Sequence, residues 1–258
     1  SDLGAGTLAS MKKEIPDRFF MEGISEQHII GMSAGLAMEG FIPYVNSIAP
    51  FLTRRCYEQV LVDLCLHDLP VRLIGNGGGV VYAPLGPTHL AVEDIAIFRA
   101  IPNMTIIAPC DAEEMLRLMP KTVDWPHPIY IRLAKGGDEV VSQNDLGFEI
   151  GKAILLRPAK DGLFITTGVM AQKAIQASIE LSEEGVECGV LHMHTIKPLD
   201  HDALKTIIPK VNAVVTVEEH FRIGGLGSAV LESCSDLIPE HASKIYRVGI
   251  PDQFADKY

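Results

Sequence analysis

Short apolar segments alternate with longer helical ones along most of the chain. In the first half, four short segments predict strands at 43–47, 71–74, 104–108 and 129–133. Longer segments around them predict helices at 26–39, 54–66, 92–100 and 112–119. This alternation is typical of a parallel sheet with helices on both faces.

The second half repeats the alternation after an irregular stretch. Residues 134–147 have a Gly-Gly pair and several polar residues without a helical period, so we place a domain linker there. Strands are predicted at 163–167, 188–193 and 213–217, and helices at 171–184, 201–208 and 227–234. The predicted fold class is therefore α/β, with two consecutive three-layer domains and mostly parallel sheets, at 1–137 and 148–258.

Charge and composition exclude several classes of function. The 258 residues carry a formal net charge of −11, which disfavours nucleic acid or an anionic membrane as the partner. Apolar runs such as 213–217 are far shorter than the roughly 20 residues that cross a bilayer, and no secretory signal opens the sequence, so we expect a cytoplasmic location. Five cysteines without a C-x-x-C pair predict buried thiols.

Glu26 is the first candidate for chemistry. It stands in the first turn of a predicted helix that is otherwise small and apolar. A carboxylate in such a place is costly unless a specific group pairs with it. The alternative is that Glu26 only complements the helix dipole.

A glycine-rich loop supplies the second candidate. It runs over 75–89, follows a predicted strand and ends at His89. Open α/β sheets bind ligands beyond the carboxyl ends of their strands, and a histidine there can move protons near neutral pH. The alternative is a helix-capping turn with an incidental histidine.

Other candidates are an aromatic ring, two cations and two histidines. Phe51 precedes a predicted helix and either stacks on a heteroaromatic ring or anchors the core. Arg132 and Lys135 leave the end of a strand, where they either hold a substrate anion or form salt bridges. His192 and His194 share one strand face, a spacing too weak to predict a metal site.

Six segments together resemble, in the same order, motifs of transketolases and deoxyxylulose-phosphate synthases. They are Asp2-Leu3-Gly4, Gly23-Ile24-Ser25-Glu26-Gln27-His28, Gly86-Pro87-Thr88-His89, Ile101-Pro102-Asn103-Met104, Lys197-Pro198-Leu199-Asp200 and Val217-Glu218-Glu219. The resemblance implies a thiamine-diphosphate pyrimidine-binding domain followed by a transketolase C-terminal domain, with further family elements before Asp2 and after Phe254. The β subunits of 2-oxoacid dehydrogenases share this layout, but the histidine motif looks more like that of transketolases.

The resemblance also assigns roles to single residues. It implies that Glu26 hydrogen-bonds the aminopyrimidine of thiamine diphosphate, that Phe51 stacks on that ring, and that Arg55 and Tyr57 line the cofactor pocket. His89 matches a histidine that contacts substrate and moves a proton.

Three further residues are expected at the substrate, and one position departs from the family. The expected substrate contacts are His28, Arg132 and Lys135. Leu85 stands where the family has an acidic residue, and it cannot accept a hydrogen bond from a sugar hydroxyl.

The family holds the diphosphate and Mg²⁺ with a different domain that carries a Gly-Asp-Gly motif, and this sequence has none. The resemblance therefore implies either a diphosphate-binding N-terminal partner subunit or a longer polypeptide of which this sequence is a fragment. With a separate partner, α2β2 is the smallest symmetric assembly, and self-association through the C-terminal domain is expected. The expected function is two-carbon ketol transfer from a ketose-type donor to an aldehyde acceptor. The alternatives are a β subunit of a 2-oxoacid decarboxylating enzyme and a non-catalytic assembly subunit.

Overall fold

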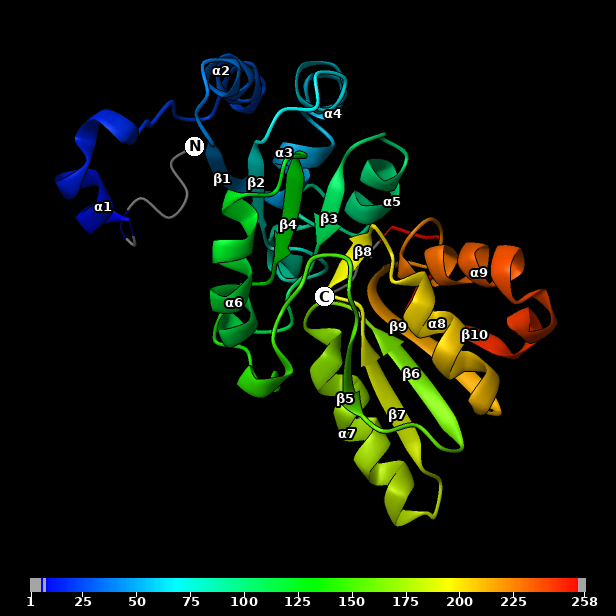
Figure 1. Ribbon diagram of the computed structural model, residues 1–258. Helices are drawn as coiled ribbons and strands as arrows, with labels where there is room; N and C mark the ends of the chain where they lie inside the picture. The colour runs from blue at the N-terminus through cyan, green and yellow to red at the C-terminus, as the bar shows by residue number, and fades with distance from the viewer. Residues whose placement is uncertain (1–5, 7, 255–258) are drawn as a thin grey trace.

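The first of two sheets is built mainly from the N-terminal half. The computed structural model describes residue 6 and residues 8–254, so the motif at 2–4 lies outside the described part. The first sheet has five strands in the order β1 (Tyr44–Ile48), β2 (Arg72–Asn76), β4 (Ile129–Leu133), β3 (Thr105–Ile107) and β8 (Thr195–Lys197) (Figure 1). All neighbours are parallel except β8, which runs antiparallel to β3.

The second sheet also has five strands. Their order is β10 (Ile245–Ile250), β9 (Ala213–Phe221), β6 (Gly162–Thr166), β7 (Cys188–His192) and β5 (Ile154–Arg157). Only β5 is antiparallel to its neighbour. The predicted α/β class with mostly parallel sheets is therefore confirmed, although the sequence pattern missed β5, β8 and β10.

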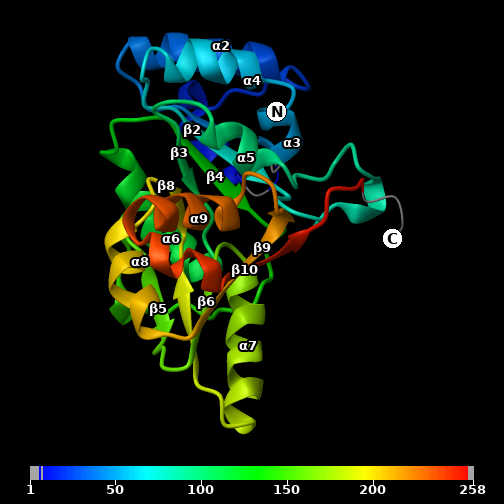
Figure 2. The ribbon, with the colours of Figure 1, turned by 90° about the vertical axis from the view of Figure 1, so that its right-hand side faces the viewer.

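Helices connect these strands and cover the sheets. They are α1 (Ala9–Glu14), η1 (Pro16–Arg18), α2 (Glu26–Met38), α3 (Ala49–Thr53), α4 (Tyr57–Gln59), η2 (Val60–Cys65), α5 (Asp94–Arg99), α6 (Ala112–Val123), α7 (Met170–Glu183), α8 (His201–Ile207) and α9 (Leu226–Leu237). Short 3₁₀ turns are η3 (Ala83–Leu85), η4 (Asn144–Leu146), η5 (Ile208–Lys210) and η6 (Pro239–Lys244). Figures 1 and 2 show α7 on one face of the second sheet, with α8 and α9 on the other. None of the helices in the described residues is long and apolar enough to span a membrane.

The helix predicted at 54–66 begins later and changes its winding. A turn at 54–56 separates α3 from α4, and α4 continues directly into η2, which is a π-helix. The amide of Leu66 donates to the carbonyl of Leu61, five residues back, which is the spacing of a π-helix. Apolar periodicity predicted the helix but does not reveal such changes in winding.

The two faces of the first sheet pack differently. On one face, Val45, Leu73 and Ile106 pack against α2, α3, η2 and α5 in a large buried cluster. The other face carries Ile107 and Ile131, which pack against α6 in a smaller cluster. A cavity of about 740 Å³ lies beside α6, bounded by α2, the sheet and the segment from Leu8 to Glu22.

A buried arginine joins the two sheets. The Arg132 guanidinium at the end of β4 donates to Asp94 Oδ2 at 2.8 Å, to the Ala91 carbonyl at 2.8 Å and to the Glu219 carbonyl in β9 at 2.9 Å. Asp94 also accepts a hydrogen bond from Tyr130 Oη at 2.7 Å. Both members of the ion pair are buried, so each depends on the other for compensation of its charge.

We therefore expect Arg132→Leu to lower the free energy of unfolding by about 3–5 kcal/mol, because Asp94 is left as a buried, uncompensated charge. Urea unfolding followed by circular dichroism measures this loss. The control is Lys152→Leu, which removes an exposed pair with Asp202 at 3.9 Å and should change stability by less than about 1 kcal/mol. Equal losses of stability from the two substitutions would contradict the role of Arg132 in joining the two sheets.

Candidate functional site

The candidate site lies at the carboxyl edge of the first sheet. Strands β1 and β2 are parallel and in register from Tyr44↔Arg72 to Ile48↔Asn76, so their carboxyl ends lie together. The first leads directly into α3, which carries Phe51, and the second leads into the glycine-rich loop that ends at His89. The helix α2, which begins at Glu26, leads into β1 of this sheet (Figure 1).

Four of the residues predicted for the site form one chain of contacts. Glu26 is 3% exposed, and its Oε2 accepts from Arg55 Nη1 at 2.6 Å. The Arg55 guanidinium lies over the Phe51 ring, 4.1 Å from the ring centroid. The Phe51 and His89 rings meet edge to face, with centroids 5.3 Å apart. The carboxylate, the cation and the two rings are thus neighbours, although 63 positions separate the first from the last in the 258-residue sequence.

An open hollow of about 600 Å³ lies against this chain of contacts. Its lining includes Pro50, Phe51, Arg54 and Arg55 from the α3 region and Pro87 and Thr88 from the glycine-rich loop. Arg54 connects the two walls, because its Nη2 donates to the Thr88 carbonyl at 2.8 Å and its Nη1 pairs with Glu93 at 2.9 Å. The hollow can therefore admit a ring-sized ligand beside the aromatic side chain.

The surroundings of Cys56, the thiol next to this chain of contacts, keep it protonated. Burial, followed by the nearby charge of Glu26, raises the pKa of the Cys56 thiol to about 12. Cys56 is fully buried, and its Sγ approaches the Phe51 carbonyl at 3.2 Å. A thiol that stays protonated near neutral pH is a poor nucleophile, so Cys56 serves packing.

The other predicted site residues lie apart from this chain of contacts. Tyr57 packs against the core cluster of the first sheet, and His28 and Lys135 are exposed. Arg132 is 6% exposed and donates to groups inside the protein, which gives it a structural role, whereas its contact with substrate stays a prediction. The strand-end position of Arg132 did not reveal this, because its partners are distant in sequence.

The glycine-rich loop is closed on itself and pressed against the second sheet. Gly79 and Ala91 exchange backbone hydrogen bonds of 2.8 and 3.1 Å, which fixes the segment that carries His89. Gly79 has φ +74°, and a Cβ there would lie 2.1 Å from the Glu219 carboxylate. Glycine is thus required for both its conformation and its size.

Sequence reasoning missed several polar neighbours of the site. Ser47 Oγ lies 3.5 Å from Glu26 Oε1, and Thr88 Oγ1 lies 2.9 Å from His89 Nδ1. The only sequence signal for Ser47 was its place at the end of a predicted strand. The adjacency of Thr88 and His89 within the quoted motif was a stronger signal.

Comparison with known proteins places both parts of the chain in one family. Residues 1–137 match the family model for the transketolase pyrimidine-binding domain, and residues 151–258 match that for the transketolase C-terminal domain. The chain belongs to the transketolase family, as the resemblance of its motifs implied.

Particular relatives are subunits of split enzymes. The chain is 39% identical over 251 residues to one subunit of the apulose-4-phosphate transketolase of Phocaeicola vulgatus, covering 97% of this chain and 79% of that protein. It is 35% identical over 255 residues to the 6-deoxy-6-sulfo-D-fructose transketolase subunit SqwH of Clostridium sp., covering 98% and 78%. A solved structure described as a split gene transketolase, inactive beta4 tetramer, superposes with a TM-score of 0.91 at 35% identity, covering all of this chain and 82% of that one.

Substitution of Gly79 by alanine tests whether the closed loop is held against the second sheet. We expect Gly79→Ala to destabilise the protein by about 1–3 kcal/mol more than Gly136→Ala, because the new methyl group must displace the Glu219 carboxylate. Gly136 is a matched control, since its φ is also positive at +92° but open space surrounds it. Thermal and urea unfolding measure the difference, and equal losses would mean that the loop is free to move away.

Proposed function

We propose that this chain is the small, C-terminal subunit of a thiamine-diphosphate-dependent transketolase-like enzyme that transfers a two-carbon ketol unit from a ketose-type donor to an aldehyde acceptor. The observation that carries the proposal is the buried Glu26 carboxylate paired with Arg55, whose guanidinium lies over the Phe51 ring in the wall of an open hollow. A subunit that only supported assembly would gain little from a buried carboxylate in this position.

The residues present fit the pyrimidine part of the cofactor. Among the described residues, Glu26 Oε1 is reached by the Ser47 hydroxyl at a long 3.5 Å, so this oxygen retains capacity to accept a hydrogen bond from a protonated ring nitrogen. Phe51 offers an aromatic face, which suits a heteroaromatic ring. In the chain alone Arg55 lies over that face, but its side chain is 41% exposed and can turn outward to admit a ring.

In this proposal each residue has a limited task. Thiamine diphosphate, when bound, supplies the carbanion chemistry that breaks and forms carbon–carbon bonds. Glu26 holds the proton at the pyrimidine ring nitrogen, and Phe51 orients that ring. His89, steadied by Thr88, donates to a substrate oxygen or moves a proton there. Arg55 is part of the wall of the hollow, and Tyr57 keeps the pocket-lining role that the resemblance implies.

A partner subunit is part of the same proposal. The sequence given has no Gly-Asp-Gly motif, and in this proposal a separate N-terminal subunit holds the diphosphate and Mg²⁺, so that each active site forms between the two kinds of chain. The relatives that are themselves named as transketolase subunits support this division. An α2β2 assembly, with self-association through the C-terminal domain, and the domain limits at 1–137 and 148–258 are parts of the same proposal.

The names of the relatives suggest which donors to test. One relative is named for a sugar 4-phosphate and the other for a 6-sulfo sugar, so both donors carry an anionic group. Lys135 is exposed after β4, where a cation could meet such a group, and His28 is exposed in the first turn of α2. Leu85 is 56% exposed and offers no hydrogen bond to a sugar hydroxyl, so donor hydroxyls would be read by other groups.

Turnover of the reconstituted enzyme tests the role of Glu26. With a partner subunit that carries Gly-Asp-Gly, we expect Glu26→Gln to lower kcat by roughly 10²-fold or more, because an amide cannot hold the proton at the ring nitrogen. Ketose phosphates, sulfo sugars and 2-oxoacids are supplied in turn as donors. Glu39→Gln, at the exposed end of α2, is the control and should keep full turnover.

Assembly must be measured on the same samples by sedimentation. Loss of turnover with intact assembly supports the proposed role of Glu26. Undiminished turnover in Glu26→Gln would overturn that role, and turnover with 2-oxoacids only would replace the proposed ketol transfer by decarboxylating chemistry.

A further inference from the structure

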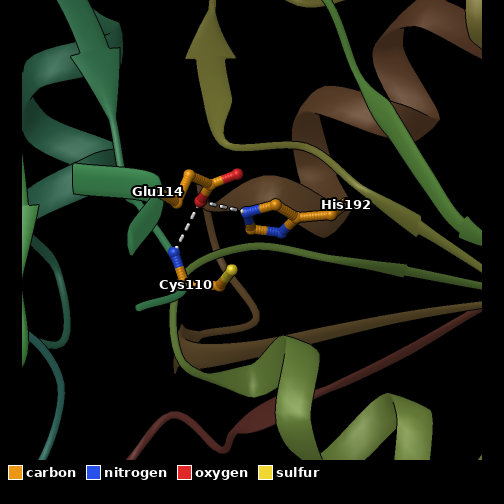
Figure 3. A group of neighbouring side chains, drawn as sticks. All are labelled: Cys110, Glu114 and His192. Atoms are coloured by element: carbon orange, nitrogen blue, oxygen red, sulfur yellow. Dashed lines mark hydrogen bonds and ion pairs between the residues drawn. The ribbon is translucent and has the colours of Figure 1, made fainter. Parts of the chain in front are cut away.

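A second group of reactive side chains lies outside the candidate site (Figure 3). Its members come from both the first and the second half of the chain. Cys110 stands in the loop after β3, Glu114 in the first turn of α6, and His192 at the end of β7. All three are completely buried. One ligand atom from each, a sulfur, an oxygen and a nitrogen, lies within 4.8 Å of the other two.

Part of this cluster is satisfied by internal hydrogen bonds. Glu114 Oε2 lies 2.9 Å from His192 Nε2 and accepts from the Cys110 amide at 2.7 Å. These contacts orient the carboxylate and hold the loop of Cys110 against α6. They involve only one of the two oxygens of Glu114 and one of the two nitrogens of His192.

The remaining polar atoms lack partners. Among the described residues, Glu114 Oε1, His192 Nδ1 and His194 Nε2 are buried without any hydrogen bond. A buried polar atom without a partner costs about 1–3 kcal/mol, so the two that belong to Glu114 and His192 require an explanation, and a bound ion is one. The contact between Glu114 Oε2 and His192 Nε2 leaves both of these atoms without a partner.

We propose that Cys110, Glu114 and His192 form a binding site for a zinc-class divalent cation that joins the two halves of the chain. Thiolate, carboxylate and imidazole are the ligands that zinc prefers, and softer or harder cations favour more uniform sets. Zinc binds such atoms at about 2.0–2.3 Å, and the three candidate ligand atoms already lie within 4.8 Å of one another. The fourth position is left for water.

Charge supports a cation with two positive charges. One thiolate and one carboxylate contribute two negative charges, which a divalent ion offsets, whereas a buried thiolate and carboxylate alone would repel each other. Binding replaces the thiol proton of Cys110 by the metal, and the proton is released to water. His192 binds as neutral imidazole through one nitrogen.

The surroundings favour three protein ligands over four. Asp111, next to Cys110, accepts from the amides of Val141 and Ser142 at 2.9 and 2.7 Å, and from the Ser142 hydroxyl and the Glu114 amide. That carboxylate is therefore committed to anchoring the segment between the two sheets. His194 also has a buried nitrogen without a hydrogen bond, Nε2, but its ring is stacked on Phe148, with ring centroids 4.0 Å apart. We therefore do not count His194 as a fourth ligand.

Metal analysis of the full chain tests the site. After incubation with excess Zn²⁺ and desalting, we expect about one zinc per chain and a higher melting temperature than after chelation. Cys110→Ser should lose most of this zinc. Cys234→Ser, which alters another fully buried thiol packed in the second sheet's cluster, should retain it.

Cobalt provides a readout that does not depend on a variant folding. The wild-type chain loaded with Co²⁺ should show a thiolate-to-metal charge-transfer band together with the intense visible bands of a tetrahedral site. The proposal is overturned if desalted wild-type protein keeps neither ion, if bound cobalt shows no thiolate band, or if Cys110→Ser keeps as much zinc as the wild type. In each case buried water would then be the partner of the orphaned atoms.

Discussion

The buried ion pair between Arg132 and Asp94 is the constraint on which the arrangement of the site depends. Arg132 ends a strand of the first sheet, Asp94 begins α5, and the same guanidinium binds a carbonyl of β9 in the second sheet. The guanidinium also donates to the carbonyl of Ala91, which pairs with Gly79 across the glycine-rich loop and stands two residues after His89. The position of His89 is thus tied to the packing of one sheet on the other.

The first sheet also positions the residues of the proposed cofactor site. Glu26 is buried in a helix start, and Phe51 stands in a short helix directly after β1, so both are set by the first sheet. The hollow beside them is open. A partner that covers it would exclude water and bring the diphosphate anchor, which agrees with the proposed division between two subunits.

The sequence predicted the elements that have a strong local pattern. Strands such as β4, with its run of Ile129 to Leu133, and the start of α2 at Glu26 were recognised from apolar runs and helix-start residues. The strand β8 was not, because three residues paired antiparallel to β3 have no periodicity to detect, and their partners lie about 90 positions away in sequence. Only long-range packing decides such additions.

The same distinction holds for the site. Local features singled out Glu26, Phe51 and His89, because Glu26 begins a helix, Phe51 follows a strand and His89 ends a glycine-rich loop. The ion pair of Glu26 with Arg55, the burial of Arg132 and the meeting of Cys110 with His192 join residues from 29 to 82 positions apart, so no local pattern contains them.

Equilibrium dialysis with labelled thiamine diphosphate tests most directly whether this chain forms half of a shared site. The dialysis compares this chain, the Gly-Asp-Gly partner and an equimolar mixture in the presence of Mg²⁺. The half-site assignment predicts that the mixture retains the cofactor much more tightly than either chain alone. The assignment would be contradicted if this chain alone retained the cofactor as tightly as the mixture does. It would also be contradicted if a mixture in which the complex has been verified retained the cofactor no more tightly than the single chains.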